Sequence, residues 1–499
     1  MNGKTPEPMQ PPQPADPLAE TRGASLPQRA RRGTLVSLGG QGGGQALRLA
    51  GNLVLARLLS PDAFGLMAIV NVVLLGLQQI SHVGIQPALV RPPRGEEPAF
   101  LHTAFTMQAV RGVGLFPACA LLAAPIARFY GEPQLVWLLP VASITALFGG
   151  VVSTRMVLAQ RRLRLERPTA IELGGRILSL IVMVGWAWHS PTVWALVAGG
   201  VVAAGTRAIA SHLVLPGRRD RFRWDREAAS EILGFGQWIL LSTLLAFVAT
   251  RFDVALLGKL LPLGLLGVYS VAIVLPGILR DVATQPIQAV LMPALSESHR
   301  QGPEVLARHF TRARAVLLPI LVVAIVGGVI GAPAFFETLY DDRYHEAGWM
   351  AQLSFAWLWF MLLQDTSGRA LLALGDARSW ALAAAVKAAA TAAGCILGFQ
   401  LGGLVGVLLG LAVASACGWA AVAWAMASRG LGVLRTDLLY TALTAALVAA
   451  GVLGGRLAAQ ALAIESPALP TLVIGGLILT PYAAWKAVPA LKAGRRGTP

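Results

Sequence analysis

The chain has 499 residues, of which 55% are hydrophobic and only 13% charged, and its mean hydropathy is +0.63. Because about a quarter of the residues in a soluble domain are charged, this composition excludes an ordinary soluble enzyme. The net charge of +16 would suit a polyanion such as nucleic acid, but the basic residues gather in short segments between apolar runs, which is the pattern of cytoplasmic loops.

The chain begins with a polar segment, 1–33, that is rich in Pro, Gln and Ala and lacks the apolar core of a signal peptide. We expect it to be a disordered cytosolic tail. The remainder divides into apolar segments of about 20 residues, the length that crosses a bilayer, separated by Pro, Gly and charged residues. About fourteen transmembrane helices are predicted, at 35–58, 64–90, 100–127, 135–158, 168–188, 192–216, 231–258, 263–292, 315–336, 349–374, 379–400, 403–427, 438–458 and 469–488.

The orientation follows from the distribution of lysine and arginine between alternate loops. When the tail is placed in the cytoplasm, the loops and span ends on that side carry roughly fivefold more Lys and Arg than those on the other side. We therefore predict an even number of spans, with both termini cytoplasmic. Short loops leave little material for a catalytic domain outside the membrane, and we expect a transporter rather than an enzyme.

Two short matches indicate an internal repeat. Arg57-Leu58-Leu59 followed by Gly65 resembles Lys259-Leu260-Leu261 followed by Gly267, 202 residues later, and Ala124-Pro125 is echoed by Ala332-Pro333. Transporters are often built from duplicated bundles. The predicted organisation is a tail (1–33), an N-terminal six-helix lobe (34–216), a basic cytosolic connector (217–230), a C-terminal six-helix lobe (231–428), and two extra helices with a basic tail (429–499).

Ionisable residues inside the predicted spans are the candidate functional groups. A charge facing lipid at mid-bilayer costs about 2.5–3.5 kcal/mol on the mildest scale, so most must pair, reach the interface or line a polar cavity. Glu172 with Arg176, and Asp365 with Arg369, have the i,i+4 spacing of ion pairs on one helix face. Five cations lack an acid on the same face within one turn, and these are Arg48, Arg111, Arg251, Arg280 and Lys387.

This excess of cations predicts an anionic substrate, because guanidinium groups bind phosphate in bidentate fashion. Interhelical ion pairs that the sequence does not reveal remain the alternative. The glycine-rich run 39–44 has no Lys after it and is therefore no nucleotide-binding loop; Gly40 and Gly44 indicate close helix packing instead. Scattered His and Cys residues predict neither a metal site nor a disulfide framework, and no cofactor is expected.

The chain resembles the polysaccharide transporter family of the multidrug/oligosaccharidyl-lipid/polysaccharide exporter superfamily, the flippases of O-antigen and exopolysaccharide precursors. The resemblance rests on four stretches: 55–65 (LARLLSPDAFG), Arg251-Phe252-Asp253 leading into Leu266-Gly267-Val268-Tyr269-Ser270, 286–296 ending in Met292-Pro293-Ala294-Leu295-Ser296, and 371–375 (LLALG) followed by 403–407 (GLVGV).

This resemblance implies two six-helix lobes around a central cavity, alternating access, and transport of a polyprenyl-diphosphate-linked oligosaccharide, such as an undecaprenyl-linked one, across the bacterial inner membrane. Polysaccharide polymerase and chain-length machinery are then candidate partners. Of the charged candidates, Arg251 and Asp253 lie within a matched stretch. We expect Arg48, Arg111, Arg251 and Arg280, with Lys387, to neutralise the diphosphate, and the following polar residues to bond sugar hydroxyls: Gln41, Asn52, Gln108 and Gln237.

Three other functions are open to a chain of this kind. A cation-coupled multidrug exporter of the same superfamily would have a cavity with net acidic character. A peptidoglycan-precursor flippase would share the cationic cavity. A membrane glycan polymerase would need a large extracytoplasmic loop with carboxylates, and the predicted loops are short.

Overall fold

The computed structural model describes residues 26–81, 97–162, 164–217, 219–287, 292–464 and 466–487, with side chains from Gly39 onward except 235–242 and several positions near 286–303 and at 487. Every element in this part of the chain is a helix. The helices are α1 (Leu26–Leu58), α2 (Pro61–Ile80), α4 (Pro98–Tyr130), α5 (Leu135–Gly150), α6 (Arg155–Arg161), α7 (Glu166–His189), α8 (Trp194–Leu213), α9 (Arg226–Leu260), α10 (Leu263–Ala272), α11 (Val274–Pro286), α12 (Met292–Gln301), α13 (Pro303–Leu339), α14 (Ala347–Ala373), α15 (Ala377–Ala427), α16 (Leu434–Ala461) and α17 (Ala468–Tyr482).

The predicted fold class, an all-α integral membrane protein, is confirmed. Among the described residues nine helices are long and apolar enough to cross a membrane, or ten if α5 and α6, bent by 58°, form one span. Each of the fourteen predicted segments overlaps a helix or a broken helix, but their exact number stays a prediction. One boundary was wrong: α1 begins at Leu26, inside the predicted tail, because the arginines of 29–32 are good helix formers. Residues 1–25 of that tail lie outside the described residues.

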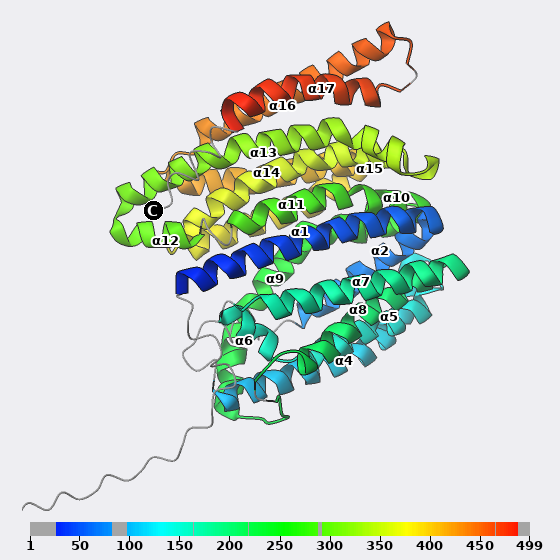
Figure 1. Ribbon diagram of the computed structural model, residues 1–499, viewed down its shortest axis with the longest axis vertical. Coiled ribbons are helices and arrows are strands. Elements are labelled where there is room, and N and C mark those ends of the chain that lie inside the picture. The colour runs from blue at the N-terminus through cyan, green and yellow to red at the C-terminus, as the bar shows by residue number, and fades with distance from the viewer. Residues whose placement is uncertain are drawn as a thin grey trace, which may run out of the picture.

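The helices lie side by side in one elongated stack (Figure 1). Helices α4, α5, α7 and α8 pack together at one side, and α13, α14 and α15 at the other, with α16 and α17 against α13 at the far edge. Between them lie α1 and α2 on one hand and α10 and α11 on the other. The long helix α9 contacts α2, α4 and α15 and so joins the two sides.

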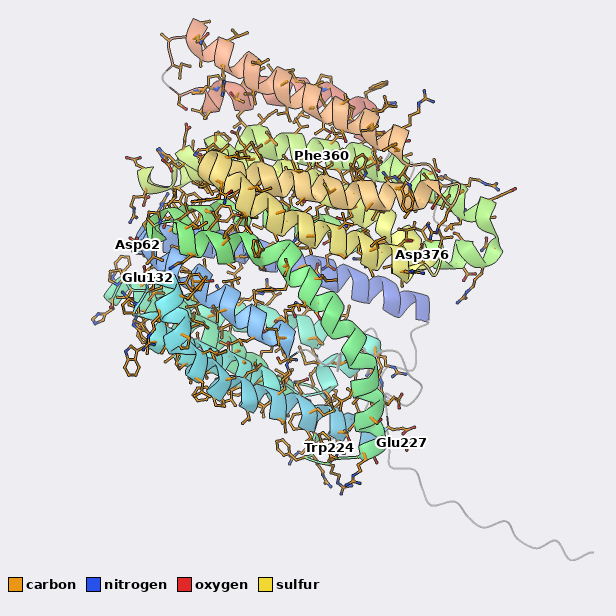
Figure 2. The ribbon with its side chains drawn as sticks, turned by 180° about the vertical axis from the view of Figure 1, so that it is seen from behind. Asp62, Glu132, Trp224, Glu227, Phe360 and Asp376 are labelled. Atoms are coloured by element: carbon orange, nitrogen blue, oxygen red, sulfur yellow. The ribbon has the colours of Figure 1, made fainter. Side chains whose placement is uncertain are left out.

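The bundle has two chemically different ends. Figure 2 places Asp62 and Glu132 at one end and Trp224, Glu227 and Asp376 at the opposite end. We call the first the turn end, because the α1–α2 and α9–α10 turns lie there, and the second the basic end, because the arginines of 219–226 lie there. The positive-inside rule predicts that the basic end is cytoplasmic.

At the turn end, α2 and α10 cross in backbone contact. A Cβ on Gly65 would lie 2.1 Å from the Leu263 carbonyl oxygen, and one on Gly267 would lie 1.8 Å from that of Pro61. The two contacts are reciprocal, because Gly65 and Gly267 are 202 positions apart and so are Pro61 and Leu263, the same offset as the predicted repeat. Only glycine allows two helices to approach this closely, so this crossing holds the two sides of the molecule together at the turn end.

Beside this crossing, polar side chains make further bonds between the two sides of the molecule. The Arg343 guanidinium donates to the carbonyl of Ala56 (3.2 Å) at the end of α1, and Arg57 donates to that of Leu339 (3.1 Å) at the end of α13. Each arginine thus satisfies carbonyls that a helix end leaves unpaired. Burial raises the pKa of Tyr340 to about 12, so its phenol stays protonated and donates to Asn52 (2.8 Å) at physiological pH.

Helix α15 turns back on itself. At about 1.5 Å per residue a straight helix of its 51 residues would exceed twice the thickness of a bilayer core. Gly402 and Gly403 have non-helical backbone angles, with φ of 54° at Gly403, and Gly398 lies against Gly406. The predicted pair of spans at 379–400 and 403–427 therefore corresponds to a tight helical hairpin.

A buried ion pair attaches α16 to the rest of the bundle. Arg314 of α13 pairs with Asp437 of α16, and their side chains are 4% and 0% exposed. The same guanidinium donates to the hydroxyls of Thr366 and Ser367 at 2.8 Å, and the Trp419 indole donates to Asp437 at 2.8 Å. These bonds link α13, α14, α15 and α16.

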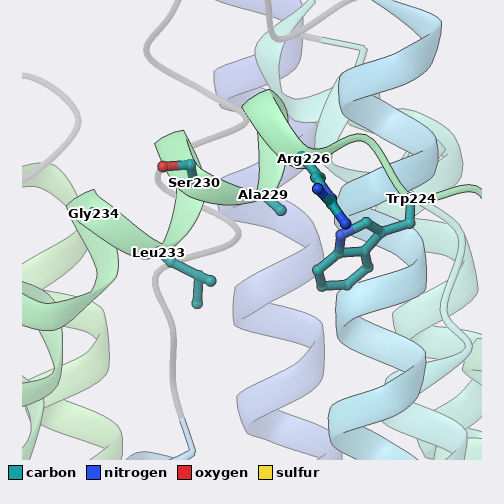
Figure 3. Close-up of a pocket in the computed structure, with 6 residues that line it drawn as sticks. All are labelled: Trp224, Arg226, Ala229, Ser230, Leu233 and Gly234. Carbon is teal, nitrogen blue, oxygen red and sulfur yellow. The ribbon is translucent and has the colours of Figure 1, made fainter.

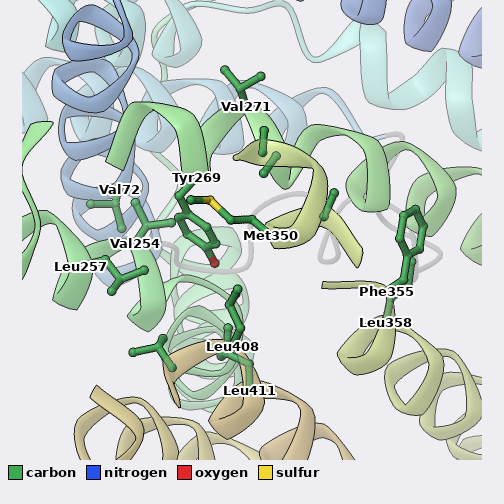
Figure 4. Packing of buried hydrophobic residues seen from close by; sticks show 14 of the residues in the cluster. Val72, Val254, Leu257, Tyr269, Val271, Met350, Phe355, Leu358, Leu408 and Leu411 are labelled. Atoms are coloured by element: carbon green, nitrogen blue, oxygen red, sulfur yellow. The ribbon is translucent and has the colours of Figure 1, made fainter. Parts of the chain in front are cut away.

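Apolar packing fills the region where α2, α9, α10, α14 and α15 meet. Figure 4 shows Val72, Val254, Tyr269, Met350 and Leu408 converging there from these five helices. Their burial fixes the helices that carry the charged residues described below.

We predict that Gly267→Val lowers the thermal unfolding temperature in detergent markedly, because its neighbour is backbone that cannot move aside and overpacking costs about 1–3 kcal/mol or more. Gly114→Val is the matched control, since a Cβ there meets nothing within 4 Å. Equal unfolding temperatures for the two variants would contradict the close crossing of α2 and α10.

Candidate functional site

A single carboxylate, Asp281 on α11, joins α1 to the other side of the molecule. The Gln45 amide of α1 donates to it at 3.1 Å, and the Arg48 guanidinium of α1 lies 3.6 Å from it. Arg280, the preceding residue, donates to its other oxygen at 3.0 Å. The contact with Arg48 is longer than a hydrogen bond, so Asp281 holds this arginine only loosely.

Further charges surround this centre. Arg48 lies within electrostatic range of Arg176 on α7 and Arg251 on α9, as well as of Arg280. Asp365 on α14 lies within the same range of Arg280, of Arg369 one turn later, and of Lys387 on α15. With Asp253, near Arg251, these residues form what we call the charge network. Its members are Arg48, Arg176, Arg251, Arg280, Arg369, Lys387, Asp253, Asp281 and Asp365.

The charge network contains six cations and three carboxylates, an excess of positive charge. Most of its members lie well inside their helices: Arg48 is ten residues from the end of α1 and Lys387 ten from the start of α15, about 15 Å along each axis. That is roughly half the thickness of a bilayer core. Most of the network is therefore at mid-membrane depth, whereas Arg369 lies nearer the end of α14.

Part of the charge network is accessible. The side chain of Arg48 is 46% exposed, and those of Arg280 and Asp281 are 30% and 32% exposed. Charged groups at this depth that faced lipid would be strongly destabilising. We conclude that these three side chains face a space that water enters.

Asp253, by contrast, is buried with its own hydrogen-bond donor. Its side chain is 8% exposed, and it accepts a hydrogen bond from the hydroxyl of Tyr269 on α10. Arg251, two residues earlier, is half-buried and lies within electrostatic range of Arg48 as well as of Asp253. Arg251 and Asp253, the two charged residues in the stretch that resembles the transporter family, therefore have different surroundings.

The structure places the other predicted binding residues apart from the charge network. Arg111 donates to Ser81 (2.9 Å) and to the Gln78 carbonyl (3.0 Å) at the end of α2. The Gln108 amide donates to carbonyls at the end of α5, among them that of Gly149 at 3.0 Å, and Asn52 accepts from Tyr340. Gln41 on α1 is exposed, and the side chain of Gln237 lies outside the described residues. Substrate contacts of these five residues stay predictions.

One pairing prediction was wrong. Glu172 was expected to pair with Arg176 on its own helix, but it lies 2.9 Å from Arg207 of α8, because a neighbouring helix offers a guanidinium at shorter range. Arg280 has no acid on its own helix face within one turn, but its long side chain reaches the carboxylate of the adjacent residue, Asp281.

Residues 54–348, more than half of the chain, match the family described as polysaccharide biosynthesis protein. The chain belongs to this family. One relative is the succinoglycan biosynthesis transport protein ExoT of Rhizobium meliloti (strain 1021). It is 25% identical over 253 residues, which are 49% of each chain. The teichuronic acid biosynthesis protein TuaB of Bacillus subtilis (strain 168) is 21% identical over 60% of this chain and 62% of its own. The chain thus spans about half of the first relative and less than two thirds of the second.

Solved transporters share the fold. The lipid II flippase MurJ in an inward closed conformation superposes with a TM-score of 0.69 at 12% identity, over 91% of this chain and 98% of that one. An inward-facing multidrug resistance MATE family transporter of the MOP superfamily superposes with a TM-score of 0.57 at 12% identity, over 77% and 95%. The family match agrees with the resemblance found in the sequence, and the superpositions confirm an all-helical membrane fold like that of these transporters. At these identities the likeness concerns the fold alone.

We predict that Tyr269→Phe lowers stability by about 1–3 kcal/mol, because it leaves the buried Asp253 carboxylate without its hydroxyl donor. Tyr130→Phe is the control: its hydroxyl makes a 3.3 Å bond to a carbonyl in a half-buried position. Thermal unfolding of both variants measures the difference, and an unchanged Tyr269→Phe protein would show that Asp253 does not depend on this bond.

Proposed function

We propose that the protein is a flippase that carries a polyprenyl-diphosphate-linked oligosaccharide across the bacterial cytoplasmic membrane, by alternating access, for the synthesis of a surface or exported polysaccharide. The observation that supports this most is the charge network, an accessible excess of cations at mid-membrane depth contributed by helices from both sides of the molecule. The family to which the chain belongs supports polysaccharide biosynthesis as the pathway.

The chemistry of the network suits a diphosphate. Arg48 and Arg280 each present a planar guanidinium to accessible space, and guanidinium groups bond phosphate oxygens in pairs. When no substrate is present, Asp281 bonds Arg280 and lies 3.6 Å from Arg48. A diphosphate that enters would replace Asp281 as their partner, while the isoprenoid chain stays in lipid and the sugars occupy the water-filled space.

This exchange of partners offers a route from binding to transport. Gln45 and Arg48 of α1 contact α11 through Asp281, so the replacement of that carboxylate weakens a link between the two sides of the molecule. A ligand shifts a conformational equilibrium only through contacts that differ between states. In this proposal the diphosphate releases the α1–α11 link, and the lobes, 34–216 and 231–428, then rock so that their contact at the turn end opens.

The arrangement in the membrane follows from the charges. The basic end, with Arg219, Arg221 and Arg300 exposed, faces the cytoplasm in our proposal, and both termini lie on that side. The lipid-linked oligosaccharide therefore enters from the cytoplasmic leaflet and leaves at the turn end.

The excess of cations over carboxylates separates this proposal from one rival function, and the family match separates it from another. A cation-coupled drug exporter would need net negative charge where the network is positive. A peptidoglycan-precursor flippase would suit the same cations, and the polysaccharide family match favours the oligosaccharide substrate over it.

We predict that Arg280→Gln slows translocation at least tenfold in proteoliposomes loaded with a polyprenyl-diphosphate-linked oligosaccharide, because a charge-assisted bond contributes about 1.5–3 kcal/mol. Translocation is measured as the fraction of the oligosaccharide that becomes protected from an externally added, membrane-impermeant glycosidase. Arg280→Lys should retain part of the rate, since it keeps the charge.

The matched control is Arg207→Gln, which removes an arginine that pairs with Glu172 outside the network. If Arg280→Gln transports at the wild-type rate, or if Arg207→Gln is equally slow, the network does not carry the substrate's phosphate.

A further inference from the structure

The connector between α8 and α9 has a fixed backbone although it forms neither helix nor strand. Three of its amides donate to side chains in the first turns of α4: Arg221 N–H to His102 Nδ1 (3.2 Å), Arg223 N–H to Thr106 Oγ1 (3.0 Å) and Asp225 N–H to Thr103 Oγ1 (3.0 Å). Before them, the Asp220 carboxylate accepts from Ser153 at 2.5 Å and from Thr154. A segment held at alternate residues on a helix presents its side chains in fixed directions.

These directions place three guanidinium groups around one cavity. Arg219, Arg221 and Arg223 line a cavity of about 860 Å³ together with His102 and Trp224. The alternation of an extended chain puts every second residue on the same side, which is why the three arginines of the connector line it together. The first turn of α4 forms another part of the wall, and the positive end of the helix dipole favours negative charge there.

The only carboxylate among the described residues that line this cavity is already engaged. Asp225 accepts a hydrogen bond from the Ala228 N–H at 2.9 Å as the N-cap of α9. In the part of the chain that the structure describes, no ion pair is formed by Arg219, Arg221 or Arg223. The cavity therefore carries a net positive charge, which attracts anions.

Two exposed aromatic rings flank the arginines. Phe222 is 69% exposed and Trp224 is 57% exposed. Trp224 also borders a second cavity, of about 480 Å³, into which Arg226 extends beside the indole (Figure 3). Exposed aromatic rings next to cations are typical of the headgroup region of a bilayer.

We propose that the connector cavity is a binding site for the phosphate of an anionic phospholipid headgroup, separate from the charge network. The three arginines hold the phosphate, while Phe222 and Trp224 enter the interfacial layer beside it. The aromatic rings favour a lipid over a soluble phosphate, because a soluble ligand gains nothing from them. The bound lipid would fix α4 and the start of α9 at the membrane surface.

The test uses the full-length protein in mild detergent, titrated with phosphatidylglycerol and, separately, with phosphatidylcholine, with bound lipid counted by native mass spectrometry. The wild type is expected to bind one phosphatidylglycerol in clear preference to phosphatidylcholine. The triple variant Arg219→Gln/Arg221→Gln/Arg223→Gln should bind it about a hundredfold more weakly, at about fivefold for each surface cation.

The matched control is Arg300→Gln/Arg308→Gln/Arg312→Gln, which removes the same charge from exposed positions of α12 and α13, outside the connector cavity. This control should keep the wild-type affinity, and lysine at 219, 221 and 223 should restore most of it. Unfolding temperatures close to that of the wild type verify that the variants fold, as expected for exposed positions.

Three results would overturn the proposal: equal binding of both lipids by the wild type, equal loss of binding in the two triple variants, or displacement of phosphatidylglycerol by inorganic phosphate at similar concentration. The last would assign the cavity to a soluble phosphate instead. Because no flipped substrate is present, these outcomes are independent of whether the charge network transports a diphosphate.

Discussion

The cost of holding charge at mid-membrane depth is the constraint on which this structure depends. Nine ionisable side chains from α1, α7, α9, α11, α14 and α15 form a chain there in which each lies within electrostatic reach of at least one other, and each alone would be destabilising by about 2.5–3.5 kcal/mol or more. Asp281 is central to the arrangement, because it is shared by Arg48, Arg280 and Gln45. Three carboxylates cannot neutralise six cations, and the remaining positive charge is the property that an anionic substrate would meet.

The two ends of the bundle complement this centre. At the turn end, glycines of α2 and α10 let the backbones touch, and Arg343, Arg57 and Tyr340 bond across the junction. At the basic end the connector instead carries arginines that stay accessible. The two sides of the molecule are thus tightly joined at the turn end, and in the proposed transport cycle this is the contact that opens to release the substrate.

Much of the fold could be predicted from the sequence, because apolar length and breaks by Gly and Pro reflect the bilayer directly. The hairpin at Gly402–Gly403 and the 202-residue offset between Gly65 and Gly267 were both visible in this way. The tertiary partners of individual charged residues could not be predicted from the sequence. Asp437, the partner of Arg314, is 123 residues away, and Glu172 pairs with Arg207 because of how α7 packs on α8. Arg48, Arg251, Arg280 and Lys387 were found as isolated cations, but only the packing of six helices shows that they belong to one network, whereas Arg111 does not.

The measurement that tests the central claim most directly is native mass spectrometry of the protein extracted gently from its own membrane, with any co-purified lipid identified by fragmentation. Our account predicts a polyprenyl diphosphate carrying sugars on the wild-type protein, more of it on Asp281→Asn, where the arginines lose their internal partner, and none on the Arg48→Gln/Arg280→Gln double variant. A wild-type protein that carries only ordinary phospholipid, or a double variant that retains the saccharide lipid, would contradict the assignment of the charge network to the substrate's diphosphate.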